Sequence, residues 1–461
     1  MSARRVAVIG GGLAGLAAGA ALRGLGAEPC VFERDAAVGG VVRSEMCDGW
    51  LIESGPCMAA EPDPVVRALM DAAGVAPLLV RADPVATNRY IVHDGVPAPL
   101  PHNLAEFTAS PLLSLAGRLR LVKERFIPAR RELSEESVDD FARRRFGDEV
   151  ADRMFDPLVA CTSAGDPRQL LARYACPQIV GHEQRSGSGL QGNLRARMDA
   201  RRRATGQPTG PWSCATGMQQ LARQLAERSA VVRTGARVDA VSAHGGKIQV
   251  VVDGQHVGPF DGAIFAVPAP GLQRMAIDLP EAHRLEQLAS MPHVSIATVS
   301  LGFRRDAVRH RLDASRLLVP SVERQSILSA VFPSSIFSGR APHDHVLLTA
   351  YLGGTRRPDV IDWPEADLIG LVHQELTLLL GVSGPPVMVR VTVRRDALPQ
   401  AVAGHARRVA AADIVEAAAG PVTFTGAWRD GLSVAEVLLG GVRAAERLAV
   451  RQGWLGVPTP A

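Results

Sequence analysis

RVAVIGGGLAG, from Arg5 to Gly15, is the stretch of sequence that decides the fold. It begins with an apolar run typical of a buried parallel strand and continues into a G-x-G-x-x-G turn at the start of a helix of small residues. In such a turn Gly10 permits the tight bend, Gly12 lets the backbone approach a pyrophosphate, and Gly15 allows the helix to pack closely on the strand. The stretch therefore predicts a Rossmann-like strand–turn–helix unit.

A second apolar run contains Val31 and Phe32 and ends in the acidic residue Glu33. At this distance from the glycine turn, a carboxylate is placed to accept hydrogen bonds from the ribose of a dinucleotide. The helix that begins at Leu13 and Ala14 would present free N–H groups and its positive dipole end to the phosphates. A glycine-rich turn without a ligand is the alternative, but the order of strand, turn, helix and acid favours a dinucleotide site.

The residues after Glu33 indicate which dinucleotide binds. A NAD-binding unit would normally proceed to its next helix, whereas this chain has a second glycine pair, Gly39-Gly40, and then Arg43. The glycines permit a backbone turn against a cofactor, and the arginine can neutralise phosphate charge. The layout resembles the flavoprotein superfamily of amine oxidases, carotenoid desaturases and protoporphyrinogen oxidases, which implies FAD. An unrelated Gly-Gly loop is the alternative.

The C-terminal part of the chain carries a second signal of the same kind. An apolar strand at residues 422–424 is followed by a turn with Gly426 and Gly431 and by a helix that starts near Ser433. In a flavoprotein, helix N–H groups at this place face the N1/C2=O edge of the isoalloxazine, where negative charge accumulates on reduction. An ordinary strand–loop–helix closure is the alternative. Together the two signals favour a flavin, with further contacts implied at Arg34, Gly55, Pro56, Val238, Ala266, Leu432 and Val434.

Length and composition are those of a globular protein with two or three domains. The chain has 461 residues, of which 47% are hydrophobic and 21% charged. Its net charge of +4 comes from 51 basic and 47 acidic residues, a balance that does not indicate a nucleic-acid partner. We see no secretory signal and no apolar run of the roughly 18 residues that a membrane-spanning helix needs. The six cysteines show no C-x-x-C spacing, so we expect reduced thiols and a cytoplasmic protein.

Strand-like and helix-like segments alternate along the rest of the chain. Strand-like runs lie at residues 88–92, 231–238, 248–252, 262–267, 294–303, 326–331 and 346–351. The runs at 248–252 and 262–267 resemble a hairpin, and the last three runs predict a second sheet. Between them, helical periodicity begins near Leu112, and Ser137 is a predicted N-cap.

These patterns predict an α/β fold with a discontinuous Rossmann-like FAD-binding domain, a mixed-sheet substrate domain and a helical insert. The FAD-binding domain is expected at residues 1–87, 205–290 and 401–461. The substrate domain is expected at residues 88–103 and 291–400, and the helical insert at residues 104–204.

Within the flavoprotein superfamily the chain most resembles the protoporphyrinogen oxidases, including their coproporphyrinogen-oxidising bacterial forms. Short separated segments carry this resemblance over almost the whole chain, and their order is more specific than any one of them. They include NRYI at 88–91, ESVDDF at 136–141, DPLVA at 156–160, LLVP at 317–320, LGG at 352–354 and GLSV at 431–434.

The resemblance implies a substrate site with several named positions. Arg89 matches an arginine that pairs with a propionate of the porphyrinogen, although a surface arginine on a strand is the alternative. Leu318, Val331 and Tyr351 fall where apolar and aromatic side chains surround the macrocycle, and ordinary core residues are the alternative. The backbone at Ala164 and Gly165 is implied to approach the macrocycle.

The implied activity is oxidation of protoporphyrinogen IX or coproporphyrinogen III in haem biosynthesis. The resemblance implies hydride transfer from the substrate to flavin N5 and reoxidation by O2. In total, six electrons are removed and H2O2 is formed. No cysteine lies beyond Cys214, so we expect the FAD to be non-covalent. We assign no side-chain general base and no metal, because no metal-spaced cluster stands out and His405, a lone histidine, is interpreted as structural.

Departures from the family pattern leave other functions open. Ala427 stands where an asparagine is common in the family. A flavin amine oxidase or polyene desaturase is one alternative, although Trp428 alone does not supply the aromatic pair that amine oxidases usually have. A non-catalytic FAD-binding paralogue is another. The resemblance also implies peripheral contact of the helical insert with the inner face of the cell membrane, and a homodimer is left open.

Overall fold

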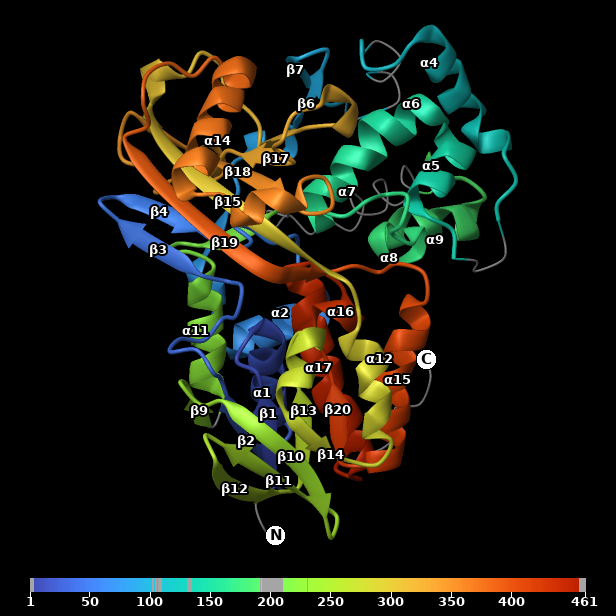
Figure 1. Cartoon of the computed structure of the whole chain (residues 1–461), viewed down its shortest axis with the longest axis vertical. Helices are drawn as coiled ribbons and strands as arrows, with labels where there is room; N and C mark the ends of the chain where they lie inside the picture. Colours follow the sequence, from blue (N-terminus) through green and yellow to red (C-terminus); the bar gives the residue numbers. More distant parts are fainter. Residues whose placement is uncertain are drawn as a thin grey trace.

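The computed structural model describes residues 4–101, 103, 106, 110–130, 135–190, 192, 210–229 and 231–455. Figure 1 shows two stacked bodies, with a parallel sheet in the lower one and a larger, mixed sheet at the upper left. A group of helices, α4 to α9, lies beside the mixed sheet at the upper right. The expected mixed α/β fold is therefore confirmed.

The parallel sheet has five strands in the order β20-β13-β1-β2-β9. Every neighbouring pair in it is parallel. Its strands come from three distant parts of the chain: β1 (Arg4–Ile9), β2 (Ala27–Phe32), β9 (Val231–Arg233), β13 (Gly262–Phe265) and β20 (Val422–Phe424). The glycine turn lies at the carboxyl end of β1, the edge at which open α/β sheets bind ligands.

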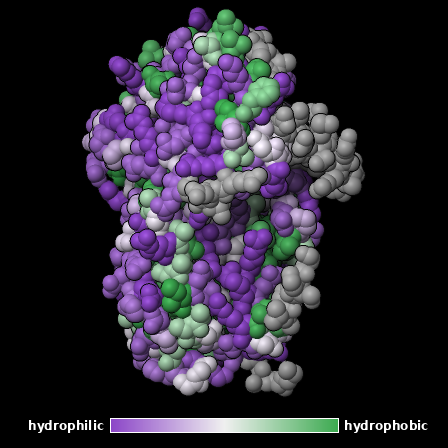
Figure 2. All heavy atoms as spheres, turned by 90° about the vertical axis from the view of Figure 1, so that its right-hand side faces the viewer, coloured by the Kyte–Doolittle hydropathy of each residue, from purple (hydrophilic) through white to green (hydrophobic). Residues whose placement is uncertain are grey.

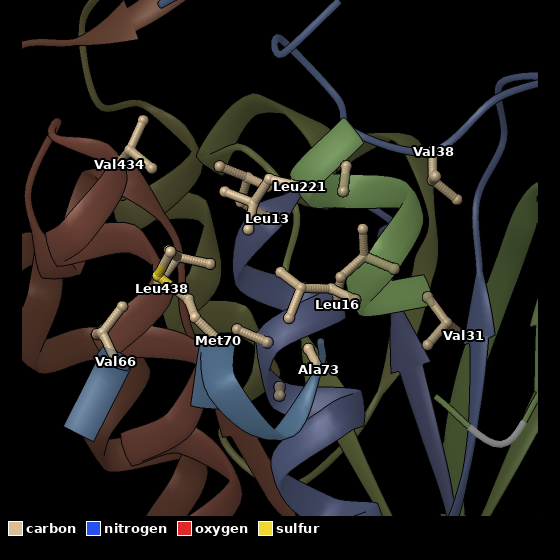
Figure 3. Close-up of a cluster of buried hydrophobic side chains, with 14 of the residues drawn as sticks. Leu13, Leu16, Val31, Val38, Val66, Met70, Ala73, Leu221, Val434 and Leu438 are labelled. Atoms are coloured by element: carbon tan, nitrogen blue, oxygen red, sulfur yellow. The ribbon is translucent and has the colours of Figure 1, made fainter. Parts of the chain in front are cut away.

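Helices cover one face of this sheet with a shared apolar core. They are α1 (Leu13–Gly24), α2 (Pro64–Ala72), α11 (Gln219–Arg228) and α17 (Val434–Arg451). Figure 3 shows Leu16 of α1 at the centre of this core, with Leu438 and Met70 on one side and Val31 on the other. An ideal Cβ on Gly441 would lie 2.2 Å from the Ala14 carbonyl oxygen, so the close packing of α17 on α1 requires glycine there.

A four-stranded sheet, together with α12 (Leu285–Ala289) and α15 (His405–Ala419), shares the core on the other face. Its order is β12-β11-β10-β14, with β10 (Val238–His244), β11 (Lys247–Val252), β12 (Gln255–Phe260) and β14 (Ala276–Asp278). The expected hairpin of residues 248–252 and 262–267 is wrong, because β11 pairs with β10 and β12 while residues 262–265 form β13. The run at 231–238 is likewise divided between β9 and β10 by a turn at Gly235, whose φ is +65°.

The second sheet has seven strands in the order β19-β15-β18-β17-β16-β6-β7. It is mixed, because β16 and β6 are parallel and the other pairs are antiparallel. The strands are β6 (Tyr90–His93), β7 (Val96–Pro99), β15 (His293–Arg304), β16 (Arg316–Leu318), β17 (Ser329–Val331), β18 (His345–Gly353) and β19 (Met388–Pro399). α14 (Glu365–Leu380) buries one face of this sheet. The opposite face carries Leu318 and Leu328, which pack against residues of the helical region.

The helical region contains α4 (Leu115–Val122), α5 (Val138–Phe146), α6 (Asp148–Val150), a π-helical turn (Ala151–Phe155), α7 (Asp156–Ser163), α8 (Ala172–Ala175) and α9 (Pro177–Ser186). Ser137 caps α5 as predicted, since its side chain accepts from the Asp140 N–H. Within the part of the chain that the structure describes, no helix is long and apolar enough to cross a membrane.

Smaller elements join the bodies. A hairpin of β3 (Ser44–Cys47) and β4 (Trp50–Glu53) follows the second glycine pair, and β5 (Leu79–Arg81) pairs with β8 (Trp212–Cys214). α13 (Pro333–Ile336) precedes β18. The expected domain boundaries stay predictions, and the expected link at residues 205–209 lies outside the described residues.

Candidate functional site

Two of the three glycines in the N-terminal turn are required by the packing of the chain on itself. Gly10 has φ +109°, and an ideal Cβ on it would lie 2.5 Å from the Ala266 carbonyl oxygen. A Cβ on Gly15 would lie 1.9 Å from the Gly10 carbonyl oxygen. Glycine at both positions is therefore needed for the turn to close, whether or not a ligand binds.

Gly12 differs, because an ideal Cβ on it meets no atom within 4 Å. It is the N-cap of α1 and provides no side-chain cap, so the N–H groups at the start of α1 receive no side-chain acceptor, although the parallel bridge of Gly12 with Gly39 directs the Leu13 N–H toward the Gly39 carbonyl. Unpaired N–H groups at a helix N-terminus, beside space that a side chain would fill, make a cradle for a phosphate. The residues present fit a dinucleotide here.

Glu33 organises this turn from the end of β2. Its carboxylate accepts hydrogen bonds from the Gly11 N–H at 2.7 Å and from the Asp35 N–H at 2.9 Å, and the side chain is buried. A carboxylate offers about four acceptor positions, so a ribose hydroxyl can still be accommodated. The observed role of Glu33 is to shape the loop, and the ribose contact stays a prediction.

The second glycine pair lies against the first turn. The Gly39 N–H donates to the Gly11 carbonyl at 2.9 Å, and a Cβ on Gly40 would lie 3.3 Å from Gly12 Cα. Gly55, followed by Pro56, supports the same loop, since a Cβ on Gly55 would lie 2.2 Å from the Val41 carbonyl oxygen. The two glycine turns are separate motifs in the sequence, but in the structure they lie against each other and form one backbone surface.

The two arginines of this loop both lie near Asp35. Arg43 donates to the Val38 carbonyl at 3.0 Å and to Asp35 at 3.1 Å, so its charge is partly compensated within the loop. Arg34 is exposed and lies 3.6 Å from Asp35. A phosphate contact by either arginine stays a prediction.

The C-terminal turn supplies a second helix N-terminus. Gly426 precedes the short helix α16 (Ala427–Asp430), and Asp430 accepts from the Gly426 N–H at 2.9 Å. Ser433 and Glu436 then form a reciprocal capping box at the start of α17. The capping box leaves the N–H groups of Val434 and Ala435 without acceptors in the described chain, and the neighbouring Leu432 is partly exposed.

Two predicted cofactor contacts lie on the sheets between these turns. Ala266 follows β13, and its N–H donates to the Ile9 carbonyl at 2.8 Å, which holds it over the glycine turn. Val238 is buried at the start of β10. Ala266 is therefore joined to the predicted cofactor site through Ile9 and Gly10, whereas a cofactor contact by Val238 stays a prediction.

The sheet register places the predicted substrate residues on one face of the seven-stranded sheet. Leu318 pairs with Ile91 and with Ser329, and Ser329 pairs with Tyr351. Paired residues share a face, and so do residues two apart on one strand, which adds Val331 beside Tyr351. Arg89, two residues before Ile91, falls on the same face if the strand is continued. This face lies opposite the one that α14 buries.

Ala164 and Gly165 are held next to this sheet at the end of α7. Ala164 is buried and left-handed, with φ +51°, and its carbonyl accepts from the Thr355 N–H at 2.9 Å. A Cβ on Gly165 would lie 2.3 Å from the Gln400 side-chain oxygen. The close packing explains the two small residues, and their approach to a macrocycle stays a prediction.

Arg316 is a site residue that the sequence reasoning missed. It is the first residue of β16, two before Leu318, and it pairs with Val331. Its Nη1 donates to Cys161 Sγ at 2.7 Å, and its Nε is buried without a partner. The sequence signal for Arg316 was its position two residues before Leu318, since alternate residues of a strand share a face. Attention to the apolar LLVP segment at 317–320 obscured that signal.

A buried polar cluster adjoins the second glycine turn. Glu53 accepts from Ser44 Oγ at 2.6 Å and from the Met218 N–H at 2.8 Å, and Arg340 Nη1 lies 3.7 Å away. Burial raises the pKa of Glu53 to about 7 in spite of these contacts. Glu53 is therefore a group that titrates near neutral pH between the sheets.

His405 has the surroundings of a structural residue. It is buried at the start of α15 and makes an edge contact with Tyr174 at 4.5 Å between ring centroids. Burial lowers the pKa of His405 to about 4, so the ring is neutral at pH 7. The structural role of His405 stays a prediction.

One trio of potential metal ligands, His93, Asp94 and Glu323, occurs in the described residues. The Glu323 carboxylate already accepts from the N–H groups of Asp94 and Gly95, and His93 contacts the Arg153 guanidinium. A neighbouring cation disfavours a metal ion, so this trio forms a hydrogen-bonded turn.

The parallel sheet, the paired glycine turns and the second helix N-terminus define a dinucleotide-binding protein of the flavoprotein class. The family model described as flavin containing amine oxidoreductase matches residues 13–449, and the chain belongs to this family and, within it, to the group of protoporphyrinogen and coproporphyrinogen oxidases. It is thus a flavin-containing oxidoreductase.

Individual relatives extend over nearly the whole chain. Protoporphyrinogen oxidase 2, chloroplastic/mitochondrial, of Arabidopsis thaliana is 30% identical, with 97% of this chain and 94% of the relative covered. Coproporphyrinogen III oxidase of Bacillus subtilis is 27% identical, with 94% and 96% covered. A crystal structure from Exiguobacterium sp. superposes with a TM-score of 0.80 at 23% identity and covers 98% of this chain and 99% of the other, which supports the fold.

Proposed function

We propose that the chain uses non-covalent FAD to oxidise a porphyrinogen, protoporphyrinogen IX or coproporphyrinogen III, to the porphyrin. Three molecules of O2 would accept the six electrons and six hydrogens that are removed, and three molecules of H2O2 would form. The observation that carries the proposal is the sheet face with Arg89, Arg316, Leu318, Val331 and Tyr351, which combines cations with apolar side chains. The names of the curated relatives support the same substrate class.

The residues of the chain would bind and orient both molecules. A bound flavin supplies the electron-accepting chemistry. The N–H groups at the start of α1 would hold the pyrophosphate, and those at the start of α17 would stabilise negative charge at the flavin edge. Burial raises the pKa of Tyr351, so its hydroxyl stays protonated at neutral pH. Leu318 and Val331 would exclude water from the substrate.

The test is an aerobic fluorescence assay of porphyrin formation from both porphyrinogens. We expect the flavinated protein to oxidise at least one of them and Arg89→Ala to raise KM by about 10-fold or more, since a charged hydrogen bond contributes about 1.5–3 kcal/mol. Arg395→Ala is the matched control. Arg395 lies on β19 of the same sheet, and this substitution removes its exposed ion pair with Asp362. If fully flavinated protein oxidises neither porphyrinogen, the proposal is wrong.

Anaerobic bleaching of the flavin separates the proposal from its alternatives. Trp428 is buried, and its indole N–H donates to the Val267 carbonyl at 3.2 Å. These contacts favour a structural role for Trp428 and not a role as one member of the aromatic pair that amine oxidases usually have. Bleaching by an amine or a polyene but not by a porphyrinogen would favour an amine oxidase or desaturase. Resistance to every donor would favour a non-catalytic paralogue.

We also propose that the helical region contacts a membrane surface from the cytoplasmic side. Figure 2 shows the face that carries this region, where hydrophilic side chains predominate and hydrophobic ones gather in small patches, several near the top. Leu115, Leu119, Val122 and Phe126 follow a helical spacing on α4 and the turn after it, and all four are exposed. Basic residues flank them at Arg118, Arg120, Lys123 and Arg125, which suits an anionic interface.

A further inference from the structure

Arg316 carries a positive charge that the described chain does not neutralise. No carboxylate among the described residues lies within ion-pair distance of it. Among the described residues, its side chain donates one hydrogen bond, from Nη1 to Cys161 Sγ, and thiol sulfur is a weak acceptor. A charge that is removed from water without an ionic partner is costly, so an anionic ligand that supplied this partner would be stabilised here.

Two neighbours of Arg316, Cys57 and Tyr351, do not supply the missing negative charge at neutral pH. Burial raises the pKa of the Cys57 thiol to about 11, and burial also raises the pKa of Tyr351. Both groups lie close enough to sense the Arg316 charge. Arg316, Tyr351 and Cys161 nevertheless remain partly exposed, so they border space that solvent or a ligand can reach.

One edge of the Arg316 guanidinium has the geometry for a carboxylate. Nη1 is directed to Cys161, whereas Nε is buried without a partner and Nη2 has no acceptor among the described residues. Nε and Nη2 form the side of the guanidinium that binds a carboxylate with two parallel hydrogen bonds. The unpartnered edge is thus the one that a carboxylate requires.

Arg316 is also beside Arg89 in the sheet. Leu317 pairs with Tyr90 and Leu318 with Ile91 in the parallel register of β16 and β6. One further step toward the start of both strands brings Arg316 opposite Arg89, at about the 4.8 Å spacing of neighbouring strands. Two adjacent arginines on the substrate face suit two carboxylates of a single molecule.

We infer that Arg316 binds a second carboxylate of the substrate next to the one assigned to Arg89. The site would then select tetrapyrroles that carry carboxylate side chains on two neighbouring pyrrole rings. This inference rests on the proposed function and specifies which part of the porphyrinogen is recognised. Arg316 would be a specificity-determining residue of that site.

The test measures binding of coproporphyrin III and of its tetramethyl ester to the flavinated protein in the same detergent buffer. We expect Arg316→Met to weaken binding of the free acid by about 10- to 100-fold and to leave binding of the ester unchanged, since charge-assisted hydrogen bonds contribute about 1.5–3 kcal/mol. Arg316→Lys should retain part of the affinity, because it keeps the charge but not the two-pronged edge. Arg395→Met is the control.

The outcomes separate this inference from the proposed function. If the wild type binds neither porphyrin and oxidises neither porphyrinogen, the proposed function fails, and the inference fails with it. If it oxidises only protoporphyrinogen IX, the same comparison is made with protoporphyrin IX and its dimethyl ester. If the wild type binds the free acid and Arg316→Met binds it equally well, the inference alone is overturned. Should Arg316→Met not fold, the Arg89→Met protein gives the answer, because a remaining preference for the acid over the ester supports Arg316 and loss of all preference contradicts it.

Discussion

The Gly11 N–H donates a 2.7 Å hydrogen bond to the buried carboxylate of Glu33. This bond joins the glycine turn after β1 to the end of β2. The other carboxylate oxygen accepts from the Asp35 N–H at 2.9 Å, so a single side chain fixes both loops. The acid of the dinucleotide motif therefore acts on the backbone of the turn, in addition to its predicted contact with a ribose.

We expect Glu33→Ala to weaken cofactor binding strongly and also to lower the stability of the cofactor-free protein by about 1–3 kcal/mol, because a buried N–H at Gly11 loses its acceptor. Glu33→Gln should retain one acceptor and have a smaller effect on stability. Flavin content and denaturant unfolding of the apo-protein measure the two effects. Unchanged apo-protein stability in Glu33→Ala would show that the carboxylate acts on the ligand alone.

Gly12→Ala and Gly15→Ala form a matched pair of substitutions. The added methyl at Gly12 enters open space, so we expect normal apo-protein stability and impaired flavin binding. The methyl at Gly15 would lie 1.9 Å from the Gly10 carbonyl oxygen, so we expect the fold itself to lose roughly 1–3 kcal/mol or more. Apo-protein melting and flavin titration distinguish them. If Gly12→Ala binds flavin normally, the phosphate cradle lies elsewhere.

Glu53 predicts a pH dependence of stability. Its pKa is raised by burial from 4.5 to about 7, so between these values the unfolded chain has lost a proton that the folded chain retains. Stability should fall as pH rises from about 4.5 to about 7, by roughly 1–3 kcal/mol.

Glu53→Gln imitates the protonated side chain and should remove this slope. The measurement is denaturant unfolding of both proteins across pH 5 to 8. We expect the variant to be more stable than the wild type at pH 8. A variant that is less stable there would mean that Glu53 is ionised and stabilises Arg340, which lies 3.7 Å away.

Arg145 is fully buried in the helical region between Glu124 and Glu183. Arg145→Met leaves the buried Glu124 without its cation, whereas Glu183 keeps its ion pair with Arg144, so we expect a loss of about 3–5 kcal/mol. Arg143→Met, on the same helix but partly exposed, should cost about 1 kcal/mol or less. Chemical denaturation measures both. Equal effects of the two changes would contradict a central role for the Arg145 cluster.

Membrane contact predicts that Phe126→Glu reduces cosedimentation with vesicles containing anionic lipid. Phe126 is 70% exposed beside basic residues. Leu378→Glu is the matched control, because Leu378 is 68% exposed on α14, outside the helical region. Sedimentation should fall with added salt, since part of the attraction is electrostatic. Equal binding of both variants and the wild type would argue against contact through α4.

Local patterns in the sequence were sufficient for the elements around the glycine turns. The strand before Gly10, the helix after Gly12 and the helix start near Ser433 were predicted because each depends on neighbouring residues alone. Local patterns did not identify Leu318 and Tyr351 as substrate residues. Those two residues were assigned only through the family resemblance. The structure adds the register that puts them on one face.

Pairing between distant segments could not be predicted in the same way. Residues 262–265 are as apolar as a hairpin strand, yet they pair with β1 and β20, because buried parallel strands and hairpin strands share composition. Arg316 was missed for a related reason. Its importance comes from Cys161 and Val331, which are neighbours in space and not in sequence.

The order β20-β13-β1-β2-β9 also constrains how the protein is made. β20, at Val422–Phe424, lies at one end of this sheet, and α17, which packs on α1, follows it. While a ribosome is still synthesising the middle of the chain, the edge of β13 and the apolar side of α1 are uncovered. Such surfaces in a nascent chain are prone to aggregate and are typical chaperone substrates. Since the predicted flavin site includes the start of α17, we expect the flavin to be retained only after the last strand and helix have left the ribosome.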